Sequence, residues 1–171
     1  EVLGNEPVKT DATKRELTPE EIRERCKKVV ALTKRVRKGD PVDAYLTSRG
    51  IGLEEYPLSL GTAHALPYDA SSSHPAMVAV ITAPDGKNVS LHRTFLAGAG
   101  KLDASDCRKL MPGRLPKGCA VRLKPLGPSD EVLGVAEGIE TALSASALFG
   151  IPVWATLNTS MMRTFVPPVG I

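Results

Sequence analysis

The spacing of apolar residues changes along the chain from a helical period to strict alternation and back. Apolar side chains recur at three- and four-residue steps after the Thr-Pro pair at 18–19, which predicts a helix that ends at Gly39. An Asp-Pro pair at 40–41 carries the same start signal and predicts a second helix that stops at Gly50. The segment 1–17 mixes charges with Gly, Pro and Thr without periodicity, and we interpret it as a linker.

Strand-like patterns dominate the middle of the chain. Residues 76–82 and 89–96 flank the Asp-Gly turn at 85–86, and this arrangement predicts a β-hairpin. Shorter strands are expected over 58–65 and 119–126. The middle of the chain should therefore form a mainly antiparallel sheet.

His92 and Arg93 occupy opposite faces of the second hairpin strand, because side chains alternate along a strand. Arg93 shares its face with the apolar residues Val89, Leu91 and Phe95. A charge in such surroundings needs a partner, which is either a carboxylate within the fold or a phosphate from outside.

The end of the chain alternates apolar strands and helices with short loops. Strands are predicted over 132–136 and 151–157, a helix over 139–149 between them, and a further helix after the Asn-Thr-Ser cap at 158–160. This order is typical of a parallel sheet with right-handed crossovers. The expected fold class is α+β, with N-terminal helices and an antiparallel, hairpin-containing sheet followed by a partial α/β unit. The expected division is a linker over 1–17, a helical and β-rich part over 18–127, and the α/β part over 128–171.

The pair Glu137-Gly138 directly follows the first of these late strands, at the sheet edge where open α/β folds place their chemistry. A carboxylate at a strand tip can hold Mg²⁺ or Mn²⁺, or it can pass a proton to and from an attacking or leaving oxygen. Glu140 lies in the first turn of the next helix. It is either a second metal ligand or an acid that complements the helix dipole.

Positive charge concentrates in two stretches, although the formal net charge of the chain is only +3. Four cations fall in the last turns of the first predicted helix, where they either complement the helix dipole or contact phosphate: Lys34, Arg35, Arg37 and Lys38. The segment 97–117 carries five more: Lys101, Arg108, Lys109, Arg114 and Lys117. This segment has no aromatic residue, so it indicates phosphate contact or solvated loop charges rather than base stacking.

Cysteine usage and hydropathy indicate the compartment. The chain has 3 cysteines at scattered positions, with neither a zinc-ribbon spacing nor a disulfide framework, so we interpret them as free thiols in a reducing compartment. Neither a signal peptide nor an apolar run of membrane-spanning length is present in these residues, and a cytoplasmic location is expected. Because the chain starts at Glu1 and ends at Ile171, it looks like a piece of a longer protein.

The stretch 132–143 resembles the first motif of the toprim domain, which bacterial-type primases, topoisomerases and some nucleases share. That motif is an apolar strand ending in Glu-Gly, followed by a helix that opens with an acidic residue, a small hydroxyl residue and Ala-Leu. The segments 46–51, 77–96 and 108–111 resemble the region that precedes toprim in primases of phages, plasmids and integrated mobile elements. The likeness thus extends over most of residues 40–165.

The resemblance implies a DNA primase, in which Glu137 is the general acid/base of nucleotidyl transfer close to the metal site and Gly138 is its accompanying glycine. It also implies Mg²⁺ or Mn²⁺ as cofactor, with Glu137 as one ligand. Single-stranded DNA template and nucleotides are the expected partners, together with a replicative helicase and without a membrane. Four residues fall in the basic region expected to contact nucleic-acid phosphates: His92, Arg93, Arg108 and Lys109.

One departure from the family pattern limits what this chain can do alone. The metal-binding Asp-x-Asp of the toprim family does not occur after residue 143, where the chain has no Asp. We therefore expect residues 1–171 to be inactive as a primase. A toprim nuclease or topoisomerase piece and a non-catalytic module that binds nucleic acid or a partner are the alternatives. The topoisomerase is disfavoured because Tyr45, Tyr56 and Tyr68 all precede the toprim-like stretch.

Overall fold

The computed structural model describes residues 17–171, so the predicted linker lies outside the described residues apart from Leu17. Helix α1 (Pro19–Ala31) begins with a capping box, in which Thr18 and Glu21 each bind the other's backbone amide. The prediction that this helix reaches Gly39 is wrong. The side-chain hydroxyl of Thr33 donates a 2.8 Å hydrogen bond to the carbonyl of Val29, and the chain then leaves the helix.

The basic run after α1 forms an edge strand instead of a helix end. Strand β1 (Lys34–Arg35) pairs antiparallel with β2 (Leu60–Pro67), and ladder hydrogen bonds to the sheet replace those of further helical turns. The helix dipole therefore does not account for the cations at 34–38. Helix α2 (Pro41–Ser48) follows, close to its predicted bounds.

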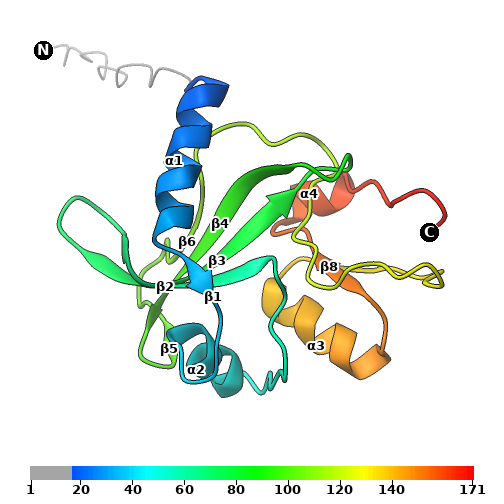
Figure 1. Ribbon diagram of the computed structural model, residues 1–171, viewed down its shortest axis with the longest axis horizontal. Coiled ribbons are helices and arrows are strands. Elements are labelled where there is room, and N and C mark those ends of the chain that lie inside the picture. Colours follow the sequence, from blue (N-terminus) through cyan, green and yellow to red (C-terminus); the bar gives the residue numbers. More distant parts are fainter. Residues whose placement is uncertain (1–16) are drawn as a thin grey trace, which may run out of the picture.

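An antiparallel sheet forms the centre of the molecule (Figure 1). Its strands follow the order β1-β2-β3-β4-β5, and β6 also pairs with β4. The predicted hairpin is confirmed as β3 (Ser73–Thr82) and β4 (Asn88–Ala97). The predicted basic loop 97–117 contains the short strands β5 (Gly100–Lys101) and β6 (Arg108–Leu110).

The end of the chain forms the expected parallel unit, which confirms the α+β class. Strand β7 (Gly134–Ala136) pairs parallel with β8 (Val153–Ala155), and α3 (Ile139–Phe149) connects them. The short helix α4 (Thr159–Arg163) follows, capped by the side chain of Asn158.

Residues 119–123 join the two sheets. Ala120 exchanges both backbone hydrogen bonds with Thr82 at the end of β3, and Val121 exchanges both with Ala155 of β8. The prediction of a strand over 119–126 is wrong in this respect, because the segment makes one bridge to each sheet rather than a ladder with either. Pro125 also removes an amide that a longer strand would need.

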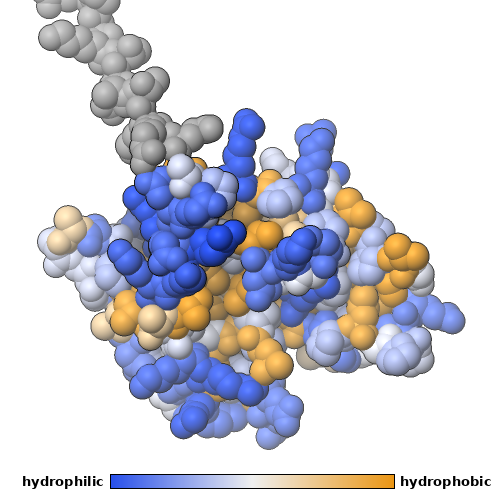
Figure 2. All heavy atoms as spheres, turned by 45° about the horizontal axis from the view of Figure 1, so that its top comes forward, coloured by the Kyte–Doolittle hydropathy of each residue, from blue (hydrophilic) through white to orange (hydrophobic). Residues whose placement is uncertain are grey.

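Helices cover both faces of the antiparallel sheet. Val29 of α1 packs with Leu91 and Phe95 on one face, while the outer side of α1 is charged (Figure 2). The other face packs against α2 and α3 in a larger core that includes Leu46 and Leu143. Among residues 17–171, no helix has the length and apolar character that crossing a membrane requires.

Candidate active site at the end of the parallel strands

Glu137 is exposed at the carboxyl end of β7, as the sequence pattern predicts. Its backbone carbonyl accepts a 2.8 Å hydrogen bond from the amide of Leu157, which follows β8. Leu157 has φ of 69°, the only positive value for a non-glycine among residues 17–171. A leucine in this left-handed conformation is strained, and such strain is concentrated at functional sites. The loops after the two parallel strands therefore hold each other in place at Glu137.

Cations from the first part of the chain line the same pocket as Glu137. This pocket has a volume of about 340 Å³, and Glu137, Gly138 and Thr141 line it together with three basic side chains: Arg49, Lys101 and Arg108. An adjoining pocket of about 240 Å³ is shared by Glu137 and Arg108 with His92, Leu110 and Leu157. The fold thus brings Glu137 close to basic side chains that lie far from it in the sequence. This arrangement is suited to a phosphate group next to a carboxylate.

Glu140 is bound within the protein. Its carboxylate accepts a hydrogen bond from the hydroxyl of Tyr45 and forms a 3.0 Å ion pair with Lys101. Burial raises the pKa of Glu140, but the bonds from Tyr45 and Lys101 outweigh it and hold the pKa below its ordinary value. Burial and the Glu140 carboxylate raise the pKa of the Tyr45 phenol. These contacts fasten the start of α3, and with it Glu137, to α2 and β5.

His92 is buried beside Glu137, on the face of β4 that its position in the strand predicts. Its Nδ1 has no hydrogen-bond partner among the described residues. Burial, reinforced by the charge of Arg108, lowers the pKa of His92 from 6.5 to about 4. The imidazole is therefore neutral at pH 7 and offers the pocket a ring that can accept or donate one hydrogen bond.

Arg93 and Lys109 lie on the opposite face of the sheet, toward α1. Arg93 donates a 3.1 Å hydrogen bond to the carbonyl of Leu110. Lys109 forms a 3.1 Å ion pair with Asp106 and lies 3.6 Å from the ring centroid of Tyr68. Of the four residues predicted to contact nucleic acid, the structure brings His92 and Arg108 to Glu137 and places these two elsewhere.

Matches to two protein families cover most of the chain. Residues 20–123, more than half of the chain, match a family described as a domain of unknown function, DUF7146. The chain belongs to this family. Residues 132–170 match a Toprim domain, so the chain is toprim-containing and its site is of a type used in nucleic-acid metabolism. Neither the curated proteins nor the solved structures contain a match.

Toprim domains generally bind Mg²⁺, but the pocket at Glu137 does not by itself fit such an ion. Within residues 17–171, no group of three or more His, Cys, Asp or Glu side chains could hold a metal. Glu137 supplies one exposed carboxylate, whereas Glu140 is held by Tyr45 and Lys101. A divalent cation needs more oxygen ligands than the pocket at Glu137 offers.

Arg49 and Leu157, which line this pocket, and Tyr45, which binds Glu140, were not assigned to the site from the sequence. Arg49 follows α2, and Tyr45 and Leu157 lie in an apolar helix and after an apolar strand. Only Arg49 carried a detectable signal, as a basic residue in a segment that resembles the region before toprim. Tyr45 is recognised only by its hydrogen bond to the distant Glu140, and Leu157 only by its positive φ angle.

Acid should destabilise the fold through His92. Its pKa is about 4 when folded against 6.5 ordinarily, so the unfolded chain binds the extra proton. The contribution is complete above about pH 6.5 and is lost as the pH falls toward 4, by about 3 kcal/mol in total. Urea unfolding of the wild type and of His92→Gln across this range measures it. His92→Gln should show a shallower pH dependence than the wild type, and equal slopes for the two proteins contradict the prediction.

Proposed function

We propose that this chain is part of a DNA primase that makes primers on single-stranded DNA during replication of a mobile element. The observation that carries the proposal is the pocket that Glu137, which corresponds by resemblance to the toprim glutamate, shares with Arg49, Lys101 and Arg108 of the DUF7146 part. A nucleotidyl-transfer site needs a proton acceptor next to a phosphate-binding surface. The resemblance of the region before toprim to primases of mobile elements supports the choice of primase.

In the proposed reaction, the hydroxyl of the growing primer or of the first nucleotide loses its proton to Glu137 and attacks the α-phosphorus of the incoming nucleotide. The bond to pyrophosphate breaks, and pyrophosphate leaves with the electron pair. Arg49 and Arg108 neutralise phosphate charge at the pocket, and His92 hydrogen-bonds the substrate from the adjoining pocket.

The tyrosines of the chain argue against a topoisomerase, whose nucleophile is a tyrosine. Burial and the Glu140 carboxylate raise the pKa of Tyr45, and burial and the Asp43 carboxylate raise that of Tyr56. The hydrogen bond to Asp106 raises the pKa of Tyr68 to about 12. None of the three tyrosines lines either pocket at Glu137, so none is placed as a nucleophile there. A toprim nuclease and a non-catalytic binding module are distinguished by the next experiment.

Primer synthesis should require carboxylates that residues 17–171 do not contribute. The protein expressed from its complete reading frame is expected to make labelled primers on single-stranded DNA with nucleotides and Mg²⁺, whereas residues 1–171 should make none. Loss of labelled template by cleavage without any primer would support the nuclease. Template binding without either product would support the non-catalytic module, and primers made by residues 1–171 would contradict the single-carboxylate site.

Arg108 and Lys109 provide a matched pair for testing nucleic-acid contact, because they are adjacent in β6 and point to opposite faces. Arg108→Ala should weaken binding to oligo(dT) and reduce the slope of log K against log salt by about 0.7, the value for one phosphate contact on a single strand. Lys109→Ala should leave the slope unchanged, because Lys109 is paired with Asp106. Fluorescence titrations at several salt concentrations measure the affinity and the slope of both variants. Equal losses of affinity would show that the template does not bind along the face of the sheet that carries Arg108.

A further inference from the structure

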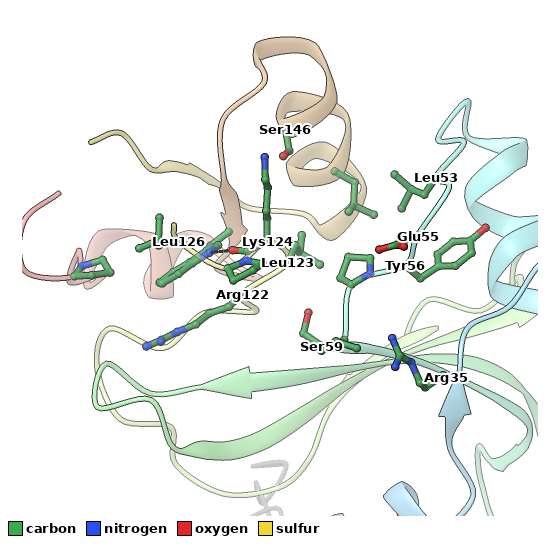
Figure 3. A pocket seen from close by; sticks show the side chains of 16 residues that line it. Arg35, Leu53, Glu55, Tyr56, Ser59, Arg122, Leu123, Lys124, Leu126 and Ser146 are labelled. Carbon is green, nitrogen blue, oxygen red and sulfur yellow. Dashed lines mark hydrogen bonds between the residues drawn. The ribbon is translucent and has the colours of Figure 1, made fainter. Parts of the chain in front are cut away.

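A large groove lies at the junction of the two matched regions, away from Glu137 (Figure 3). It has a volume of about 970 Å³. The loop 53–59 forms one wall, the segment 122–126 the other, and α3 contributes Leu143 and Ser146. A molecule in this groove would touch both the DUF7146 part and the Toprim part of the chain.

The lining of the groove is mainly apolar. Leu53, Leu126 and Leu143 line it together with Trp154, and Leu58 on its edge is 77% exposed. An exposed leucine next to a concave apolar surface is typical of a protein interaction site. The groove therefore favours an occupant with apolar side chains.

The aromatic rings at the groove are already covered, which disfavours nucleic acid as the occupant. Trp154 donates its indole N–H to the carbonyl of Lys124 at 2.8 Å, and the guanidinium of Arg122 lies 4.6 Å from its ring centroid. The hydroxyl of Tyr56 bonds to Asp43, and Lys38 lies 5.8 Å from the centroid of its ring. Single-strand sites stack bases on open rings, and neither ring is open in that way.

Two exposed cations line the groove. Arg35 comes from β1, and Lys124 projects from the 122–126 wall toward Ser146 (Figure 3). Neither forms an ion pair within residues 17–171. Arg35 also lines the neighbouring pocket with Lys34 and Arg37, which continue the positive surface beyond the groove. Because these cations follow α1 on a sheet edge, complementing a helix dipole does not explain them, and Glu55 is the one acid that lines the groove.

Two polar groups in the lining lack a partner. The hydroxyl of Ser59 and the Nε of Arg122 are buried and make no hydrogen bond within the described residues. Both lie on groove walls. Both atoms are closed to solvent, so their missing bonds belong to the interior of the walls and do not select an occupant.

We infer that this groove binds an extended peptide segment of a partner protein in which acidic residues alternate with large apolar ones. The apolar side chains fill the space between Leu58 and Leu143, and the acids pair with Arg35 and Lys124. The inference does not depend on the proposed function, since the groove shares no residue with the pockets at Glu137.

Selection from a displayed library of random short peptides on the 171-residue protein tests the inference. Enriched peptides should combine Asp or Glu with Leu, Phe or Trp, and their fluorescein-labelled forms should bind in anisotropy titrations. Leu58→Asp and Lys124→Glu should each weaken this binding by about tenfold or more, because each removes a contact and adds a negative charge that repels the acidic peptide. Lys117→Glu, an exposed lysine outside the groove, is the matched charge control and should change it by less than about twofold.

Three results would overturn the inference: no enrichment of acidic-apolar peptides, equal binding to peptides with Lys in place of the acids, or binding unchanged by both groove variants. Displacement of the peptide by oligo(dT) would assign the groove to nucleic acid instead. Thermal unfolding of the variants, both at exposed or edge positions, excludes loss of the fold as the cause. Oligo(dT) binding that depends on Arg108 should persist in the groove variants, so the failure of either proposal is recognised separately.

Discussion

Glu137→Gln is expected to lower primer synthesis by about 10² to 10⁴-fold in the protein expressed from its complete reading frame, the range for loss of a general acid/base. The amide keeps the size of the side chain but cannot take a proton from the attacking hydroxyl. Glu137 is exposed and its carboxylate makes only a 3.4 Å contact with Thr159, so the melting temperature should not fall. Initial rates of labelled nucleotide incorporation, with Mg²⁺ and template saturating, measure the effect.

Glu131→Gln is the control for this substitution. Glu131 is an exposed glutamate shortly before β7 and lines none of the pockets at Glu137, so its amide variant should retain full activity. Oligo(dT) binding in the absence of divalent cations adds a second readout. Glu137→Gln removes negative charge beside Arg108 and should tighten that binding. Retained primer synthesis by Glu137→Gln would remove Glu137 from the proposed chemistry.

Glu140→Ala is expected to lower the free energy of unfolding by about 2 kcal/mol, the scale of a hydrogen bond to a charged group. The substitution leaves the buried hydroxyl of Tyr45 and the ammonium of Lys101 without their acceptor. Tyr45→Phe should cost less, because it removes the donor while Glu140 keeps Lys101. The double variant should be less destabilised than the sum of the two singles, because both remove one interaction.

Tyr68→Phe provides the matched comparison. Tyr68 makes the same kind of phenol–carboxylate bond with Asp106, but on the surface, and its loss should cost less than the loss of the Tyr45–Glu140 bond. Urea unfolding at pH 7 measures all the variants. Equal losses at Glu140 and Tyr68, or additive effects of Glu140→Ala and Tyr45→Phe, would show that the contact does not fasten α3 to the sheet.

Local patterns predicted those elements whose hydrogen bonds close within a short stretch of chain. The Asp-Gly turn places β3 and β4 in register, and the apolar run before Glu137 forms β7 with α3 directly after it. The end of α1 depended on a distant partner instead. Lys34 pairs with Thr62 in β2, and the helical period of the sequence contains no information about that pairing.

The candidate site was predictable in its carboxylate but not in the cations that share its pocket. Arg108 and Lys109 are indistinguishable as neighbouring cations in a loop-like sequence, and the pairing of β6 with β4 decides which one faces Glu137. The contact between Tyr45 and Glu140 joins residues 95 positions apart, so no spacing rule indicates it. Tertiary pairing, rather than residue type, selects the members of this site.

The segment 119–123 has a consequence for any attempt to separate the two matched regions. A cut at the turn around Gly127 would leave Val121 on one piece and Ala155 on the other, each with backbone groups that had been paired. Unpaired N–H and C=O groups of this kind tend to pair with another strand. The two pieces should therefore reassemble when mixed, as a split protein does, because the Val121–Ala155 bridge joins the two matched regions in space.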